Sequence, residues 1–327
     1  MSIAANVIRV HEVGGPEVLR YETISLAEPG PNEVRVRNHA IGLNYIDVYF
    51  RTGLYPQPLP GEIGKEGAGV VEAVGAAVTE VQVGDRVAYA CNPNGAYASV
   101  RNMPSSHLVK LPDAISFETG AAMMLQGLTA QYLLRRTYEV KPGDTILFHA
   151  AAGGVGLIAC QWAKALGATV IGTVSTEEKA ALARAHGCTH TILYTKENVA
   201  ERVREITGGM GVPVVYDSVG KDTLAASLDS LRPRGLFVSY GNASGPIQNF
   251  DLALLAQKGS LYVTRPTLFT YTAQRAELLQ AAQELFAAVE SGAVKISINQ
   301  RYALADAAQA HRDLEARKTT GSTILLP

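Results

Sequence analysis

The sequence has few cysteines, no excess of charge of either sign and no long apolar run. Its three cysteines, Cys91, Cys160 and Cys188, are too scattered for a disulfide framework, which favours a reducing compartment. A formal net charge of −1 argues against a nucleic-acid partner held by a broad basic surface. No stretch approaches the roughly 18 consecutive apolar residues of a membrane span, and the N-terminal residues lack the apolar core of a signal peptide. We therefore expect a cytoplasmic protein with neither a membrane nor a nucleic acid among its partners.

The first third of the chain differs in pattern from the rest, and 327 residues are enough for two domains. Short β-branched runs bounded by Gly and Asp, such as 33–43, 67–75 and 81–90, are typical of a small barrel or sandwich. At 116–140 a Ser-x-x-Thr start and a long apolar-periodic body predict a helix.

Strands and helices alternate from Asp144 to about Val263. The expected strands are 145–150, 168–174, 190–194, 212–219 and 235–241, and the expected helices between them include 156–166, 176–186 and 198–207. This alternation predicts an α/β fold with a doubly wound parallel sheet. A helix at 272–292 and strand-like stretches at 296–304 and 321–327 follow.

Residues 151–156, Ala-Ala-Gly-Gly-Val-Gly, fit the dinucleotide fingerprint G-x-G-x-x-G with Ala151 in place of the first glycine. Gly153 would let the backbone approach a pyrophosphate, and Gly156 would let the following helix pack close to the sheet. The helix N-terminus would add N–H groups for the phosphates. A tight strand–helix turn alone would also explain the glycines, but the strand before the loop and the helix after it favour a dinucleotide site.

The end of the second strand indicates which dinucleotide. NAD proteins place an acid there for the ribose 2′-hydroxyl, but this strand ends in Val174, Ser175 and Thr176, with Lys179 one turn later. These hydroxyl and ammonium groups can bind and neutralise a 2′-phosphate. The acids that follow, Glu177 and Glu178, fit solvated charges at a helix N-terminus. The pattern favours NADPH.

Several motifs together resemble the quinone oxidoreductases related to zeta-crystallin, in the medium-chain dehydrogenase/reductase superfamily. They are the fingerprint, GGPEVL (14–19), GLNYIDVYFRTGLYP (42–56) and KEGAGVV (65–71). The resemblance implies a GroES-like, mainly β catalytic domain at 1–125, a Rossmann domain at 126–265 and a C-terminal segment at 266–327 that returns to the first domain. It also implies a dimer or a tetramer, and we expect a homodimer, formed by Rossmann edge strands, here LFVSYG (236–241) and SLYVTRP (260–266).

The resemblance also locates a difference from the zinc alcohol dehydrogenases of the same superfamily. Their catalytic zinc ligands match Asn44, Lys65 and Leu125 in this chain, and amide, ammonium and alkyl groups are poor or impossible zinc ligands. Without a Lewis acid, alcohol oxidation loses its main driving element. We therefore expect a reductase with no metal site, because quinones and activated alkenes accept hydride from NADPH without a metal.

The candidate catalytic residues are Asn44, Tyr49 and Gln126, which would position the acceptor or stabilise charge on its oxygen. Tyr45, Tyr49, Arg51 and Tyr55, in the stretch that resembles the active-site loop of the family, are the candidate substrate contacts. Packing at a domain boundary would explain the tyrosines equally well, and Arg51 alone could be a solvated surface charge.

The cofactor residues come from the fingerprint, from strand ends and from the resemblance. Asn44 and Asp47 would lie near the nicotinamide ribose, Tyr45 and Thr129 would contact the cofactor, and Tyr194 and Arg317 would join Lys179 around the 2′-phosphate. Ordinary turn chemistry is an alternative for Gly241. The remaining candidates are Gly153, Gly154, Val155, Thr173, Ser175, Thr176, Ser218, Val219, Gly241, Asn242, Val263, Thr264 and Arg265.

Two alternatives to quinone reduction remain open. The same scaffold could reduce α,β-unsaturated carbonyls such as an enal, an enone or an enoyl thioester. It could also be a non-enzymatic NADPH-binding protein, crystallin-like or RNA-binding. The cluster of His186, Cys188 and His190 fits a helix–turn–strand connection with Gly187 as helix C-cap better than a metal site.

Overall fold

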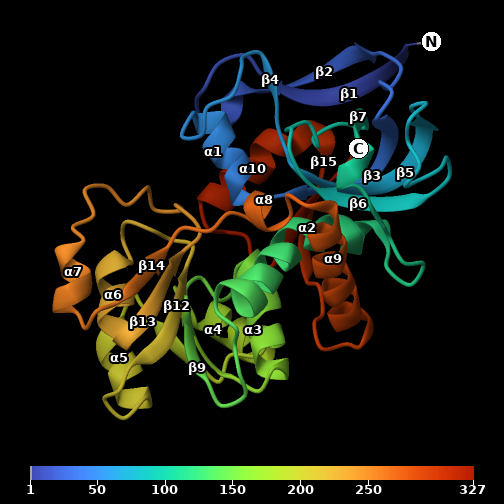
Figure 1. Cartoon of the computed structure of the whole chain (residues 1–327). Coiled ribbons are helices and arrows are strands. Elements are labelled where there is room, and N and C mark those ends of the chain that lie inside the picture. The colour runs from blue at the N-terminus through green and yellow to red at the C-terminus, as the bar shows by residue number, and fades with distance from the viewer. Residues whose placement is uncertain (1) are drawn as a thin grey trace. The chain divides into compact units, whose positions relative to one another are not determined.

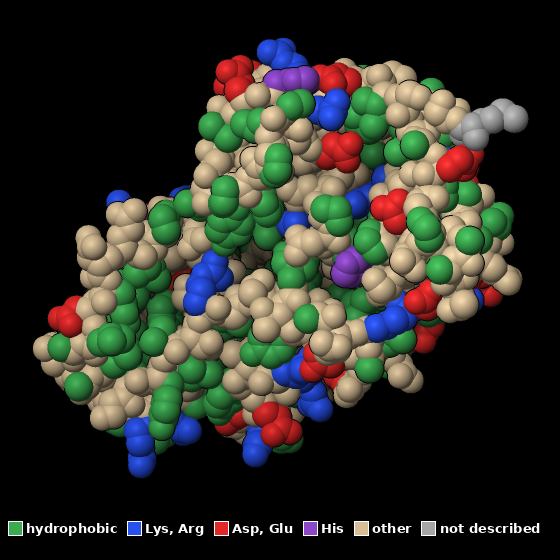
Figure 2. Space-filling view, turned by 45° about the horizontal axis from the view of Figure 1, so that its top comes forward, with side chains coloured by type: hydrophobic (Ala, Val, Ile, Leu, Met, Phe, Trp, Pro, Cys, Tyr) green, Lys and Arg blue, Asp and Glu red, His purple; other side chains and the backbone are tan. Residues whose placement is uncertain are grey.

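The computed structural model describes residues 2–327, which form two compact units. The first unit comprises the chain up to Leu128, Thr272–Glu290 and Ile296–Pro327, and the second comprises Thr129–Tyr271 and Ser291–Lys295. Figure 1 labels most of the helices and strands of both. Among these residues, no helix combines the length and the apolarity that crossing a bilayer requires. On the face drawn in Figure 2, basic and acidic side chains are interspersed.

Two sheets form the framework of the first unit. The larger has the strand order β15-β16-β3-β5-β6-β8, with β7 also paired to β3, and the smaller has the order β2-β1-β4. The strands are β1 (Ile3–Val10), β2 (Leu19–Leu26), β3 (Glu33–Leu43), β4 (Gly61–Glu62), β5 (Glu66–Val74), β6 (Arg86–Ala90), β7 (Val100–Pro104), β8 (Val109–Lys110), β15 (Ile298–Ala303) and β16 (Ser322–Leu326). The short Gly-bounded runs of the sequence are therefore strands of a mainly β unit.

The C-terminal strands complete the sheet that the N-terminal residues begin. β16 pairs antiparallel with β3, placing Ile324 opposite Gly42, and β15 pairs parallel with β16. One hydrophobic core includes Ile8 and Val36 from the start of the chain and Leu304 and Leu325 from its end. Burial of these side chains holds both ends of the chain in one domain.

Four helices accompany these sheets. They are α1 (Tyr45–Thr52), α2 (Phe117–Tyr132), α9 (Arg275–Glu290) and α10 (Ala307–Glu315). Ser116 caps α2, as its Ser-x-x-Thr pattern predicts, because its hydroxyl accepts the N–H of Thr119. Helix α1 was not predicted: the stretch taken for an active-site loop folds as a helix between Asn44 and Gly53, which has a φ of 79°.

The second unit is built on a six-stranded parallel sheet with the order β11-β10-β9-β12-β13-β14. Its strands are β9 (Thr145–Phe148), β10 (Thr169–Val174), β11 (His190–Leu193), β12 (Val212–Asp217), β13 (Leu231–Ser239) and β14 (Tyr262–Thr264). This is the order of a Rossmann domain, so the predicted fold class is confirmed.

Helices cover both faces of this sheet (Figure 1). The helices of this unit are α3 (Gly154–Ala165), α4 (Glu177–Ala185), α5 (Val199–Ile206), α6 (Leu224–Ser230), α7 (Ala253–Gln257) and α8 (Leu268–Tyr271). The strand order also corrects one expectation. LFVSYG lies largely in β13, between β12 and β14, so it cannot offer an edge, whereas β14 can.

Candidate functional site

The fingerprint loop in the second unit turns sharply between β9 and α3. Ala150 has a φ of 53°, its carbonyl accepts the N–H of Gly153, and Gly153 is the N-cap residue of α3. A Cβ on Gly156 would lie 2.5 Å from the carbonyl oxygen of Ala150, so only glycine fits there. The first-turn N–H groups of Gly154 and Val155 belong to the end of the helix that attracts anions. The loop therefore fits a pyrophosphate.

A buried polar network lies behind this loop. The Ser227 hydroxyl donates to Asp217 Oδ2 at 2.7 Å and lies 3.0 Å from His149 Nε2. Because Ser227 has one hydrogen, His149 Nε2 carries a proton and donates to it, and Nδ1 accepts from the Thr173 hydroxyl at 3.0 Å. Burial lowers the pKa of His149, consistent with a neutral ring. The Thr173 side chain is thus committed to His149.

The same network shapes the loop after β12. Asp217 Oδ1 accepts the N–H groups of Val219 and Gly220 at 2.7 and 3.0 Å. A Cβ on Gly241 would lie 2.4 Å from the carbonyl oxygen of Ser218, so glycine lets the loops after β12 and β13 touch. These loops lie at the carboxyl ends of parallel strands, where open α/β sheets bind ligands.

The candidates after β13 and β14 also lie together. The Arg265 guanidinium donates to the carbonyl oxygen of Ser239 at 3.1 Å. With the Asn242 amide oriented so that both its ends are satisfied, its oxygen accepts from Arg265 at 3.2 Å and its nitrogen donates to the Gly241 carbonyl. Val263 and Thr264 belong to β14 itself, and Thr129 is a buried residue of α2.

The residues predicted to bind the 2′-phosphate gather at the ends of β10 and β11. Thr176 is the N-cap residue of α4, and its hydroxyl accepts the N–H of Lys179. The carbonyl of Ser175 accepts from Thr195, and the N–H of Tyr194 donates to Val174. Arg317 lies in the first unit, so its predicted meeting with Lys179 stays a prediction.

The first unit brings two of the predicted catalytic residues together. Gln126 Nε2 donates to Asn44 Oδ1 at 3.2 Å, and Asn44 Nδ2 donates to Glu66 Oε2 at 2.6 Å. Glu66 is fully buried, and its other oxygen accepts the N–H of Leu125 at 2.8 Å. Sequence reasoning missed Glu66, although it belongs to the KEGAGVV motif.

Asp47 holds the start of α1. Its carboxylate oxygen Oδ2 accepts the N–H of Asn44 and the hydroxyl of Tyr97, both at 2.9 Å. Asp47 is fully buried, and burial raises its pKa to about 7. Its oxygen is therefore used within the first unit, where it fixes the backbone of Asn44.

The three residues matched by the resemblance to zinc ligands, Asn44, Lys65 and Leu125, have other partners in this structure. Asn44 bonds Glu66 and Gln126, and Leu125 offers Glu66 only its backbone N–H. Lys65 is buried, donates to Asn92 and lies over the ring of Phe50, and burial lowers its pKa to about 8. Nowhere in residues 2–327 do three or more His, Cys, Asp or Glu side chains form a group that could hold a metal ion.

The three candidate tyrosines form an aromatic cluster on and after α1. The ring centroids of Tyr45 and Tyr49 are 5.5 Å apart, and those of Tyr49 and Tyr55 are 5.2 Å apart. Tyr49 is buried, whereas Tyr45 and Tyr55 are half-buried. Such a cluster offers flat apolar surface and phenolic hydroxyls side by side.

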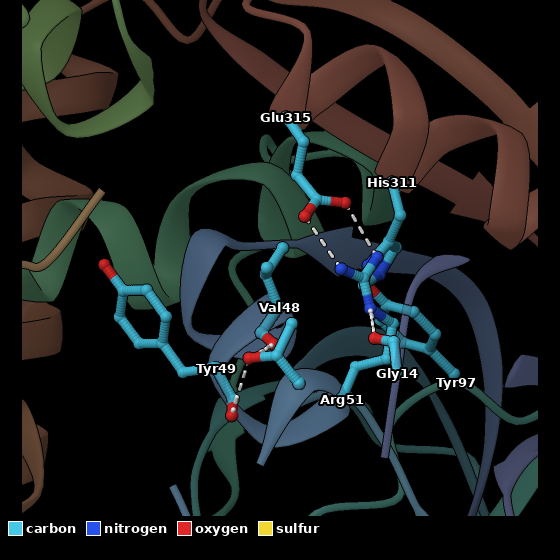
Figure 3. Close-up of polar contacts among 8 residues, drawn as sticks. Gly14, Val48, Tyr49, Arg51, Tyr97, His311 and Glu315 are labelled. Atoms are coloured by element: carbon cyan, nitrogen blue, oxygen red, sulfur yellow. Dashed lines mark hydrogen bonds and ion pairs between the residues drawn. The ribbon is translucent and has the colours of Figure 1, made fainter. Parts of the chain in front are cut away.

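Arg51 does not belong to this cluster. Figure 3 shows the Tyr49 ring pointing away from Arg51, whose guanidinium donates to both oxygens of Glu315 at 2.8 and 2.7 Å and to the carbonyl of Gly14. Arg51 is only 1% exposed, and His311 lies beside it. The expectation that Arg51 contacts substrate is therefore corrected: a buried cation needs such partners, and here they join α1 to α10.

Comparison with known proteins adds to this geometry. Residues 30–113 match the family described as alcohol dehydrogenase GroES-like domain, and residues 154–285 match the family described as zinc-binding dehydrogenase. A quinone oxidoreductase of Pseudomonas aeruginosa is 62% identical over 99% of this chain and all of its own length. A 2-haloacrylate reductase of a Burkholderia species is 49% identical over 97% of this chain and 98% of its own.

The fold agrees with a solved structure of the same group. The crystal structure of Escherichia coli quinone oxidoreductase complexed with NADPH superposes with a TM-score of 0.97, at 54% identity, over 98% of this chain and all of the other. Full-length identity above 50% to quinone oxidoreductases goes together with the same two kinds of domain. The chain belongs to the quinone oxidoreductase family of the medium-chain dehydrogenase/reductase superfamily.

Proposed function

We propose that this protein is a zinc-independent oxidoreductase that transfers reducing equivalents from NADPH to quinones. The observation that carries the proposal is the use of Asn44, Lys65 and Leu125 at the zinc positions: Asn44 and Leu125 bond the buried Glu66, and Lys65 bonds Asn92. The names of the relatives support quinones as acceptors, and the NADPH complex of the E. coli relative supports the cofactor.

The second unit would hold the cofactor. Gly153, Gly154 and Val155 would bind the pyrophosphate, and Ser175, Thr176, Lys179 and Tyr194 would bind the 2′-phosphate. The loops that carry Ser218, Val219, Gly241, Asn242 and Arg265 would orient the remainder. When bound, NADPH supplies a hydride to an electrophilic acceptor.

The first unit would act on the acceptor. The aromatic faces and edges of Tyr45, Tyr49 and Tyr55 suit an aromatic acceptor ring, and the Asn44 and Gln126 amides can donate to an acceptor oxygen as it gains charge. We propose that residues 1–125 form the catalytic domain and 126–265 the Rossmann domain, although Gln126, the first residue of the second range, still belongs to the first compact unit, which runs to Leu128. Residues 266–327 would return to the first, as the pairing of β16 with β3 supports.

We further place the protein in the cytoplasm as a homodimer, with quinones and not nucleic acid or membrane as its partners. All three cysteines are free and buried, as in proteins of reducing compartments. The edge strand β14 exposes Tyr262 and Val263, which supports pairing between two copies.

The test is steady-state oxidation of NADPH and NADH by the EDTA-treated protein with 1,4-benzoquinone, 9,10-phenanthrenequinone, a 2-alkenal, crotonyl-CoA and 2-chloroacrylate. We expect turnover with NADPH and quinones that survives EDTA. Turnover confined to the alkenes would favour an alkene reductase, which the 2-haloacrylate reductase relative supports as the second candidate. Loss of quinone turnover in EDTA would contradict zinc independence.

A variant pair tests the phosphate site. Lys179→Met should raise KM for NADPH about tenfold and leave KM for NADH unchanged, since one charge-assisted hydrogen bond contributes about 1.5–3 kcal/mol. The matched control is Lys164→Met, at the exposed far end of α3. Equal effects of Lys179→Met on both cofactors would remove this lysine from the phosphate site.

A further inference from the structure

A chain of buried side chains runs from Glu66 to Ser322 through two amides. Glu66 begins β5, Asn44 precedes α1, Gln126 lies in α2 and Ser322 begins β16. Glu66 is fully buried, and the other three side chains are at most 7% exposed. Each contacts the next: Asn44 with Glu66 at 2.6 Å, Gln126 with Asn44 at 3.2 Å, and Ser322 with Gln126 at 2.8 Å.

At Ser322 this hydrogen-bond chain has two acceptors and only one hydrogen. The Ser322 hydroxyl lies 2.8 Å from Gln126 Oε1 and also 2.8 Å from the carbonyl oxygen of Ala122. A hydroxyl has one hydrogen and can donate fully to only one of these two acceptors. When Asn44 Nδ2 donates to an ionised Glu66, either Gln126 Oε1 or the carbonyl oxygen of Ala122 therefore lacks a full hydrogen bond from Ser322.

Turning both amides by 180° reverses every hydrogen bond and serves every group. Gln126 Nε2 then donates to the Ser322 hydroxyl, which gives its own hydrogen to Ala122. Asn44 Nδ2 donates to Gln126 Oε1, and Asn44 Oδ1 faces Glu66 Oε2. Two oxygens at that distance need a hydrogen between them, so the reversed direction requires a protonated Glu66. The hydrogen-bond chain can therefore run in two directions, one when Glu66 is ionised and one when Glu66 is protonated.

The groups that surround Glu66 allow both its ionised and its protonated state. Asp47 is the acidic side chain that acts on it from α1, Tyr97 lies nearby in the loop before β7, and the N–H groups of Met124 and Leu125 face it from α2. Burial, reinforced by the charge of Asp47, raises the pKa of Glu66 to about 8. A Cβ on Gly42 would lie 2.2 Å from Glu66 Oε2, so a residue without a side chain makes room for the carboxyl.

We propose that Glu66 is a positioning residue whose proton sets the direction of the Asn44–Gln126 amide chain. Each amide keeps one spare N–H and one spare lone pair in either direction, but reversal exchanges their positions. Proton binding at the fully buried Glu66 carboxyl thus decides on which side the Asn44 amide presents its N–H groups. This inference rests on the function proposed above only in giving Asn44 a role toward the acceptor.

The first test follows the side-chain amide resonances of Asn44 and Gln126 by NMR in the full-length protein without cofactor or quinone, from about pH 6 to about pH 10. We expect both NH2 groups to shift together in one titration near pH 8. In Glu66→Gln the amide oxygen should keep accepting the N–H of Leu125, which turns the NH2 group toward Asn44, so both amides should stay at the low-pH positions of the wild type. Amide resonances that do not respond to pH in the wild type would overturn the proposal.

The second test is the pH profile of kcat/KM for the quinone with saturating NADPH. Glu66→Gln should lose the wild-type inflection near pH 8 and keep the low-pH limiting value at every pH. Asp47→Asn should move the inflection to lower pH, since a like charge beside Glu66 is removed. Glu118→Gln, an exposed carboxylate of α2 paired with Arg301, is the control and should follow the wild type.

The two tests separate two kinds of failure. If Glu66→Gln does not fold, the amide titration of the wild type still decides the proposal, together with the shift of its midpoint to lower pH in Asp47→Asn. Retention of the full inflection in a folded Glu66→Gln would refute it. Absence of quinone turnover alongside a clear amide titration would refute the proposed function and leave the role of Glu66 toward Asn44 standing.

Discussion

Gly153, the N-cap residue of α3, and Gly156, in the first turn of α3, lie three residues apart, and a methyl group would meet different surroundings at each. At Gly156 it would approach backbone atoms of Ala150 and Ala151 to 2.5 and 2.7 Å. At Gly153 the nearest of these atoms is the Ala150 carbonyl oxygen, 3.2 Å away. Backbone atoms cannot move aside as a flexible side chain does. The missing side chain at Gly156 therefore makes room for the backbone of Ala150 and Ala151, whereas the missing side chain at Gly153 makes room for a ligand.

This difference predicts opposite effects of one substitution. Gly156→Ala should destabilise the protein by about 1–3 kcal/mol, as overpacking does, and lower Tm in the absence of cofactor. Gly153→Ala should lower Tm less than Gly156→Ala does, and it should raise the Kd for NADPH at least about tenfold, because its methyl group occupies the approach to the pyrophosphate. Calorimetric titration and thermal unfolding of both variants measure this. An unchanged Kd in Gly153→Ala would place the pyrophosphate elsewhere.

Residue types and spacing revealed some side chains of the site and not others. The contact between Asn44 and Gln126 joins two residues that were predicted separately. Glu66 was missed because its character comes from burial and from Leu125, 59 residues along the chain. Arg51 was misjudged for a related reason: its carboxylate partner, Glu315, lies 264 residues away. A cation whose carboxylate partner lies far away in the sequence can be mistaken for a functional cation.

At the scale of elements, α1 shows a local signal that was available and overlooked. Asn44 with Asp47 three residues later is a helix N-terminal pattern, and Gly53 at positive φ is a common C-terminal one. Local signals of this kind specify a helix but not its packing partner. Helix α10 is joined to α1 by the Arg51–Glu315 ion pair, and His311 of α10 lies 3.1 Å from the hydroxyl of Tyr97.

The joint between α1 and α10 predicts a loss of stability in acid. Burial, with a smaller effect of Arg51, lowers the pKa of His311 from 6.5 to about 3. The native state therefore keeps His311 neutral while the unfolded chain binds a proton below pH 6.5. Its contribution to stability is complete above pH 6.5 and is lost as the pH falls toward 3, by up to about 1.4 kcal/mol per pH unit.

Urea unfolding at several pH values between about 4.5 and 7.5 would measure this effect. His311→Gln, which cannot take up a proton, should be less stable at neutral pH yet lose less stability on acidification. His39→Gln, at an exposed position of β3, should keep the wild-type slope. Parallel pH dependence in the wild type and His311→Gln would contradict a neutral buried His311.

At the scale of the whole molecule, the strand order decides where a second copy can pair. The alternation of strands and helices predicted the parallel sheet. No pattern within a strand indicates which strands pair with it, so β13 was wrongly expected to lie at an edge. β14 lies at the edge, and Tyr262 on it is 62% exposed. A two-fold axis at this edge would bring equivalent residues of both copies together.

Two variants test assembly through β14. We expect the wild type to have twice the 34.7 kDa mass of the chain in size-exclusion chromatography with light scattering, and Tyr262→Lys to shift it toward the single-chain mass. Tyr21→Lys, on the exposed edge strand β2, should leave the mass unchanged. A wild type of single-chain mass would disprove the dimer.

The pairing of β16 with β3 has a consequence for how the protein is made. Most of the second unit, Thr129–Tyr271, is one continuous stretch, so it can fold on the ribosome as soon as it has emerged. β3 is translated early, but its partner strand β16 follows the whole of the second unit in the sequence. Until β16 has emerged, β3 has an open edge toward it, and a nascent chain with such an edge is a substrate for chaperones. A nascent chain that still lacks β16 can therefore hold a folded cofactor domain and an unfinished catalytic one.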